Sequence, residues 1–116
     1  LAGPDQLVVS TTVTGVDARA LHADVALDGE LCAATAPAVA DQVQRLLALG
    51  VTDLRFDLHR LRLCTSAGID LWLDAAAEVA PRDGDVRLDG ASGVVRRALD
   101  AVGVSDSAEL RSPGHL

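Results

Sequence analysis

The most constraining feature of this chain is the order in which strand-like and helix-like hydrophobic patterns follow one another. Apolar residues alternate with polar ones over 20–31 and 52–58, and they recur every three or four residues over 35–50 and 66–80. These are the periods of strands and helices. Strands separated by helices pair in parallel, whereas strands joined by a short turn form an antiparallel hairpin. The order β-β-α-β-α-β-α therefore predicts one α/β domain with a mixed sheet of four to five strands and an N-terminal hairpin.

The expected boundaries follow from caps and turn residues. Thr35 precedes Pro37 as an N-cap, and Gly50 ends the first helix. The other expected elements are strands at 7–13, 20–31, 52–58 and 86–88, helices at 66–80 and 92–103, a turn at 81–85 and a short strand in the tail. An extension of the third strand to Leu63 is the alternative for its end. Ser92 and Gly103 are expected to cap and stop the third helix. Residues 1–116 then form one domain, with its core over about 7–110.

Two apolar faces are expected to meet in this core. In the third strand, the alternation directs Leu54, Phe56 and Leu58 inward. The inward stripe of the second helix is expected to contain Ile69, Trp72, Leu73, Ala76 and either Val79 or Ala80.

The charge balance narrows the classes of partner. The chain carries 17 acidic and 10 basic side chains, a net charge of −7, and aromatic residues make up 2% of it. Such a surface repels nucleic acids and anionic membranes, and it offers few rings on which bases could stack. A basic protein partner fits better. No apolar run approaches the length of a membrane span, and two cysteines are too few for a secreted disulfide scaffold, so we expect a cytoplasmic protein.

The motifs of common enzymes and metal proteins are missing from the sequence. It contains neither a phosphate-binding glycine loop, nor HExxH, nor paired CxxC. The three histidines are scattered: His22 and His59 lie at polar strand positions, and His115 lies in the tail. We therefore expect no cofactor and no metal. A hydrolase that uses Ser66 would need a nucleophile elbow and a base, which are not apparent, so we expect a binding protein rather than an enzyme.

The junction Cys64-Thr65-Ser66-Ala67-Gly68 joins the third strand to the second helix. One interpretation is local: the hydroxyl of Thr65 or Ser66 caps free N–H groups of the helix. The other is functional. A phosphate on Ser66 would be tolerated at the positive end of the helix and would reverse the local charge, and the small Ala67 and Gly68 would let another protein approach.

Acidic residues follow Ser66 at helical spacing. Asp70, Asp74 and Glu78 lie one turn apart, on the side of the helix opposite Trp72. They form either a solvated face or a docking ridge for a basic partner surface.

Three stretches resemble STAS domains, the fold of anti-sigma factor antagonists. DLHRLRLCTSAGIDLWL (57–73) is similar to the strand and turn that lead into D-S-S-G-[LI] at the start of the family's second helix. LDGELCAATAPAV (27–39) resembles its G-E-L-D segment, and VRLDGASGVVRRALDAVGV (86–104) its fourth strand and third helix. Together they cover about residues 7–110 in the family's order.

The resemblance implies a function. In the family, a kinase-type anti-sigma factor phosphorylates the first serine of D-S-S-G, and the unphosphorylated antagonist binds that kinase and releases the sigma factor. This serine corresponds to Ser66, with Thr65 as an alternative target. Together with the acidic ridge, the resemblance gives these expected partner-contact residues: Glu30, Cys32, Thr65, Ser66, Ala67, Gly68, Asp70 and Asp74. Two family acids are replaced, one by Thr65 and one by Cys32, so phosphorylation of Ser66 is slow or absent on this reading.

Two alternatives stay open. Cys32 and Cys64 lie close together if the fold holds, so they are either a redox pair that gates binding or two inert small residues. STAS-like domains also serve as soluble subunits or regulatory modules of transport systems, and this is the alternative function. The sequence does not decide the oligomeric state.

Overall fold

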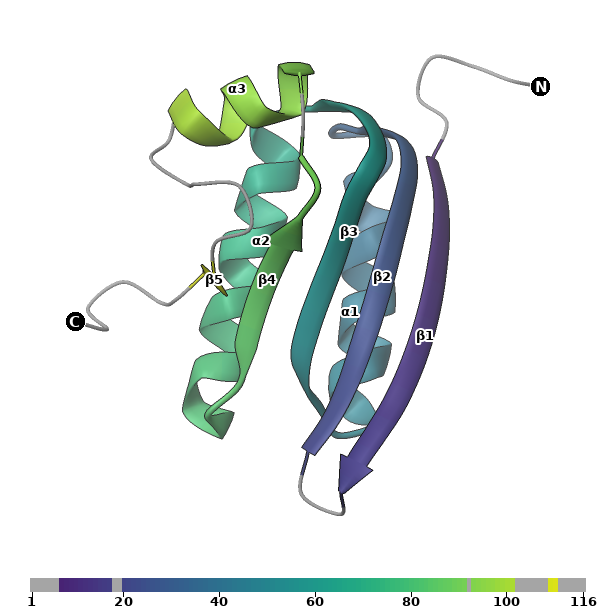
Figure 1. Cartoon of the computed structure of the whole chain (residues 1–116), viewed down its shortest axis with the longest axis vertical. Helices are drawn as coiled ribbons and strands as arrows, with labels where there is room; N and C mark the ends of the chain where they lie inside the picture. The colour runs from purple at the N-terminus through teal and green to yellow at the C-terminus, as the bar shows by residue number, and fades with distance from the viewer. Residues whose placement is uncertain (1–6, 18–19, 92, 102–108, 111–116) are drawn as a thin grey trace.

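A five-stranded sheet organises the chain, in a computed structural model that describes residues 7–17, 20–91, 93–101 and 109–110 (Figure 1). The elements are β1 (Leu7–Asp17), β2 (Ala20–Leu31), α1 (Ala36–Ala48), β3 (Val51–Cys64), α2 (Ser66–Val79), the short 3-10 helix η1 (Ala80–Arg82), β4 (Asp85–Asp89), α3 (Gly93–Ala101) and β5 (Glu109–Leu110). The strands lie in the order β1-β2-β3-β4-β5. The predicted mixed α/β fold is confirmed.

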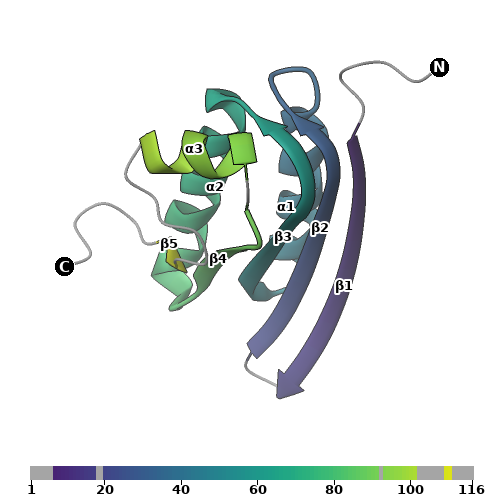
Figure 2. The ribbon, with the colours of Figure 1, turned by 45° about the horizontal axis from the view of Figure 1, so that its top comes forward.

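The pairing pattern also agrees with the prediction. β1 and β2 form an antiparallel hairpin, β2, β3 and β4 run parallel, and β5 returns antiparallel to β4. The helices α1 and α2 cover one face of the sheet, and α3 lies near the ends of β3 and β4 (Figures 1 and 2). The expected cap Ser92 and stop Gly103 of the third helix lie outside the described residues.

The core lies between the sheet and the pair α1 and α2. Leu54, Phe56 and Leu58 of β3 are fully buried, as the alternation predicts. Trp72 of α2 is also fully buried and packs against Phe56, with the ring centroids 6.1 Å apart and tilted by 56°. The chain has no other aromatic side chain, so aliphatic residues fill the remaining core.

The predicted inward stripe of α2 is wrong at one position. Leu73 is 40% exposed, whereas Leu71 and Ala75 are buried. The reason is that α1 packs beside α2, so α2 has two covered sides, one facing the sheet and one facing α1. A helix buried on two sides does not show the single stripe that periodicity assumes.

Three register shifts interrupt the pairing of β3 with β2, and each adds one extra residue to β3. The first lies between Val51 and Asp53, the second between Asp57 and Arg60, and the third between Leu61 and Leu63. Each bulge reverses the direction of the following side chains. As a result Leu61 and Cys64 are buried while Leu63 is half-buried. The strand thereby reaches the α2 turn with its apolar side chains still directed inward.

Within the described residues, no helix is long and apolar enough to cross a membrane.

Candidate partner-binding site

The turn between β3 and α2 is held by backbone hydrogen bonds. Thr65 has extended backbone angles (φ −94°, ψ 178°) and precedes the first helical residue, Ser66. The Thr65 N–H donates to the Leu31 carbonyl at 2.9 Å, and the Thr65 carbonyl accepts the N–H of Gly68 at 3.0 Å and of Ile69 at 3.3 Å. These bonds fix the start of α2 to the end of β2.

The hydroxyl cap expected from Thr65 is absent. Thr65 occupies the N-cap position of α2, but its side chain forms no capping hydrogen bond within the described residues. Ser66, the first residue of the helix, is exposed. Its side chain therefore lies at the surface, beside the positive end of the α2 dipole, where an anionic group is electrostatically favoured.

A second loop meets the same edge of the sheet. Leu31 at the end of β2 pairs in register with Cys64 at the end of β3, which brings the following Cys32 toward the Thr65 turn. Thr35 organises this loop: its hydroxyl accepts the Cys32 N–H at 3.0 Å and donates to the Glu30 carbonyl at 2.7 Å. Thr35 is the N-cap residue of α1, as predicted, but its side chain holds the loop and makes no cap bond to the helix.

Gly68 has a packing role that the sequence did not reveal. It is buried, and a Cβ atom at this position would lie 2.7 Å from Leu31 Cδ2 and 2.8 Å from Cys64 Sγ. Only glycine lets the first turn of α2 approach the ends of β2 and β3 this closely. Ala67 is half-buried. Glycine at position 68 is thus needed to place the helix against the sheet. The accessible surface of the turn comes from Ser66 and Thr65.

The predicted acidic ridge is exposed. Asp70, Asp74 and Glu78 are all accessible on α2, which contains no basic residue. Asp74 and Glu78 also border a groove of about 490 Å³ between α1 and α2. Its remaining lining residues are Ala40, Val43, Gln44, Leu71, Ala75, Ala77 and Pro81. This groove could not be predicted from sequence patterns, because it depends on how the two helices pack.

Both cysteines are thiols in the structure, and no disulfide joins them. Cys32 is half-buried, whereas Cys64 is buried and lies 3.4 Å from the Thr65 carbonyl oxygen. Burial raises the pKa of the Cys64 thiol to about 12. Because the thiolate is the reactive form, Cys64 is a slow nucleophile and a poor candidate for rapid oxidation. The redox pair stays a prediction.

The burial of Cys64 makes thiol labelling a direct test. Iodoacetamide at about pH 8 is expected to modify Cys32 in the folded protein and to modify Cys64 only after unfolding, since the thiolate of Cys64 is suppressed. Peptide mass spectrometry before and after denaturation measures both sites, with Cys64→Ala as the control for assignment. Fast labelling of Cys64 in the native state would contradict the buried thiol.

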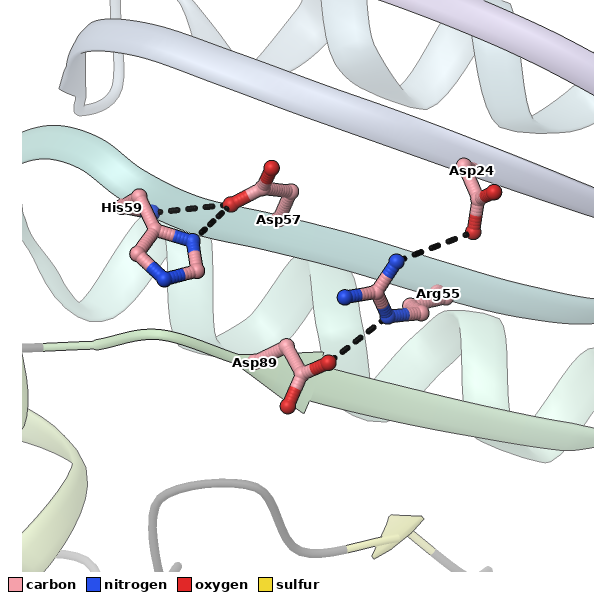
Figure 3. A network of polar contacts seen from close by, with 5 residues as sticks. All are labelled: Asp24, Arg55, Asp57, His59 and Asp89. Atoms are coloured by element: carbon pink, nitrogen blue, oxygen red, sulfur yellow. Dashed lines mark hydrogen bonds and ion pairs between the residues drawn. The ribbon is translucent and has the colours of Figure 1, made fainter.

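The face of the sheet that α1 and α2 do not cover carries a network of charged side chains (Figure 3). Arg55 lies between Asp89, at 2.6 Å, and Asp24, at 3.6 Å. His59 Nδ1 lies 2.5 Å from Asp57 Oδ1. This side-chain bond, followed by the bond from the His59 backbone N–H, lowers the pKa of Asp57. The Arg55 contacts connect β3 with β2 and β4, and the His59 contact lies within β3, all on an accessible surface.

The other titratable groups do not form a metal centre in the described part of the chain. His22 Nδ1 lies 3.4 Å from Asp53 Oδ2 on the sheet surface. His22 is 44% exposed and His59 is 67% exposed at the side chain, in agreement with the expectation of surface histidines. Among the described residues, no group of three His, Cys, Asp or Glu side chains could hold a metal ion. His115 lies outside the described residues.

Comparisons with known proteins agree with this architecture. The family model described as "Mlab, STAS domain" matches residues 5–112. An anti-sigma factor antagonist from Mycobacterium paratuberculosis has a similar structure, with a TM-score of 0.70 and 22% identity over 89% of this chain and 83% of that one. Two structures of the antagonist SpoIIAA are also similar. The unphosphorylated form has a TM-score of 0.69 and 22% identity over 82% of both chains. The phosphorylated form, from Bacillus, has a TM-score of 0.62 and 21% identity over 82% and 85%. No curated protein sequence matches the chain.

Proposed function

The chain belongs to the STAS domain family, and we propose that it is an anti-sigma factor antagonist. In this proposal it binds a kinase-type anti-sigma factor in the cytoplasm and so releases a sigma factor. It acts as a binding protein and phosphorylation substrate and needs no cofactor. The observation that carries the proposal is the exposed Ser66 at the first residue of α2. We assign to it the role of the family's phosphorylated serine because the stretch around it resembles D-S-S-G.

The proposed docking surface combines three neighbouring features. They are the loop at Glu30 and Cys32, the turn at Thr65 and Ser66, and the accessible side of α2. Hydrogen bonds from Thr65 to Leu31 and from Thr35 to Glu30 support it, because they hold the two loops in one arrangement before a partner arrives. A surface that is already ordered loses little conformational entropy when it binds.

The acidic residues of α2 give this surface a negative charge. Asp70 and Asp74 follow Ser66 at successive helical turns and are exposed. A basic surface on the anti-sigma factor would be attracted to them, which raises the association rate and disfavours acidic partners. Ala67 and the buried Gly68 shape the start of the helix beneath these contacts.

The proposed switch is phosphorylation. The Ser66 hydroxyl oxygen attacks the γ-phosphorus of ATP bound by the kinase, ADP leaves, and a base of the kinase takes the hydroxyl proton. The product adds about two negative charges one helical turn before Asp70. In the proposed complex the partner packs closely on the small, neutral Ser66 hydroxyl, so the larger phosphate no longer fits there and its charges lose their hydration. This cost exceeds the attraction of the basic partner surface, and the complex dissociates. Thr65 and Cys32, which replace family acids, make this transfer slow; Thr65 is the alternative acceptor.

A binding comparison tests the proposal. The wild-type chain and Ser66→Ala are expected to bind the host's kinase-type anti-sigma factor with similar affinity, and Ser66→Asp is expected to bind at least about 100-fold more weakly. Isothermal titration calorimetry with the purified anti-sigma factors of the host measures this difference. Leu49→Asp is the matched control, because it adds the same charge at an exposed position beyond the far end of α1.

The possible results separate the parts of the proposal. Equal binding by Ser66→Asp would remove the phosphorylation switch while keeping the antagonist role. Weaker and less salt-dependent binding by Asp74→Lys, with Asp41→Lys on α1 as its control, would support the acidic docking surface. Binding to no anti-sigma factor, together with capture of a membrane-transport component from host lysate, would favour the soluble transport subunit instead.

A further inference from the structure

The outer edge of β1 is a long strand edge that pairs with no other strand among the described residues. β1 spans 11 residues and pairs with β2, and it is the first strand in the order of the sheet. Figures 1 and 2 both show it at the margin, with no described element beyond it. In an antiparallel ladder, every second residue directs its N–H and C=O groups away from its neighbour. β1 therefore presents a row of backbone donors and acceptors along its free edge.

In the part of the chain that the structure describes, this edge lacks the features that normally protect a strand edge. Proteins prevent edge pairing with very short strands, charged side chains, prolines or bulges. The opposite edge uses two of these, because β5 has only two residues and one is Glu109. In β1, residues 7–16 include neither a charged residue nor proline, and the register shift lies at the very end, between Gly15 and Asp17.

The charge distribution favours a second copy of this chain as the occupant of the edge. Each copy carries a net charge of −7, so most approaches between copies place acidic groups opposite each other. Residues 6–16 form the longest stretch of the sequence without Asp, Glu, Lys or Arg. Two copies that meet along β1 therefore avoid the repulsion that other surfaces would cause.

Incompletely covered apolar side chains follow the same strand. Val13 of β1 pairs with buried Ala23 and so points to the helix-covered face, yet it is 45% exposed. Val9, on the same side, is half-buried. Val8 points to the other face and is 58% exposed. A neighbouring strand would cover part of this apolar area on both faces of the sheet.

We propose that β1 pairs antiparallel with β1 of a second copy, about a two-fold axis near Thr11, so that the two sheets become one. In this register Val9 lies opposite Val13 of the second copy, and Ser10 lies opposite Thr12. Each pair is uncharged and repeated by the symmetry, which is the requirement for a closed dimer. The Ser66 turn lies at the carboxyl end of β3, away from this edge, so the dimer presents two separate docking sites.

Sedimentation of the full chain tests the dimer. The wild type is expected to shift with increasing concentration from a mass of 12.0 kDa to twice that value. Val13→Lys is expected to weaken dimerisation at least about tenfold, because it places a charge on the pairing edge. Val94→Lys is the matched control: Val94 is an exposed valine of α3, 52% accessible, and its replacement should leave the dimer intact. Circular dichroism verifies that both variants fold.

Hydrogen exchange provides a second readout that does not depend on any variant. If β1 is the interface, alternate amides of residues 7–17 become protected as protein concentration rises, while the amides of α2 do not change. Three results would each overturn the proposal: a monomer at every concentration, a dimer that Val13→Lys leaves intact, or a dimer without added protection in β1. Protection of β1 by a different protein bound to a monomer would assign the edge to that partner and would also overturn it. None of these measurements involves an anti-sigma factor, so they are independent of the proposed function.

Discussion

Replacing Trp72 by alanine is expected to lower the free energy of unfolding by about 3–5 kcal/mol. The side chain is fully buried, it packs against Phe56, and it is the largest residue of the core. Its removal leaves a cavity between α2 and the sheet that aliphatic neighbours cannot fill without moving the helix. Because small domains are stable by only about 5–15 kcal/mol, this single change removes a large part of the total.

Urea unfolding followed by circular dichroism measures the effect. Leu73→Ala is the matched control on the adjacent, 40% exposed position, and it is expected to cost less than about 1 kcal/mol. Trp72→Phe is informative for a second reason. The indole N–H is buried and has no hydrogen-bond partner among the described residues, so its loss offsets part of the lost volume. A small effect of Trp72→Ala would show that the ring does not fill the core.

Replacing Gly68 by alanine is expected to destabilise the protein by about 1–3 kcal/mol and to weaken partner binding as well. Alanine is the better helix former by about 1 kcal/mol, so propensity alone predicts stabilisation. Steric overlap makes the net effect on stability unfavourable, because the new Cβ would lie 2.7 Å from Leu31 Cδ2 and 2.8 Å from Cys64 Sγ. Relief of that contact moves the first turn of α2, and Ser66 moves with it.

A double-mutant cycle separates contact from propensity. Leu31→Ala alone is expected to destabilise the core, and Gly68→Ala is expected to cost less in that background than in the wild type. Denaturant unfolding gives the four free energies of unfolding, and calorimetry with the proposed anti-sigma partner gives the effect on binding. If Gly68→Ala stabilises the wild-type chain, or if the two changes are additive, the close contact with Leu31 is not what requires glycine.

Sequence patterns predicted those parts of the fold that depend on local periodicity. The alternation at Leu54, Phe56 and Leu58 identified a strand with one buried side, and the spacing after Ser66 located α2. The hairpin and the parallel pairing followed from the order of the elements. Leu73 was misassigned because periodicity assumes one covered side, and α2 has two.

The remaining features depend on contacts between distant segments. The three bulges of β3 arise from its register with β2, which the sequence of β3 alone does not contain. The role of Thr35 requires the Glu30 carbonyl, five residues away, to face its hydroxyl. The groove beside Asp74 forms only where α1 and α2 pack side by side, because both helices line it. The acidic ridge itself was predictable, because Asp70, Asp74 and Glu78 belong to one helix and one period.

Because its only tryptophan is buried, the chain carries an intrinsic fluorescent reporter of the folded core. Trp72 lies on the side of α2 that faces the sheet, whereas the acidic residues lie on the accessible side. The fluorescence of its indole therefore reports whether the core is intact, and a protein that docks on the outer side of α2 leaves the surroundings of the ring unchanged. Native emission together with lost affinity identifies a variant that folds and fails to bind. Red-shifted emission identifies one whose loss of affinity begins with the fold.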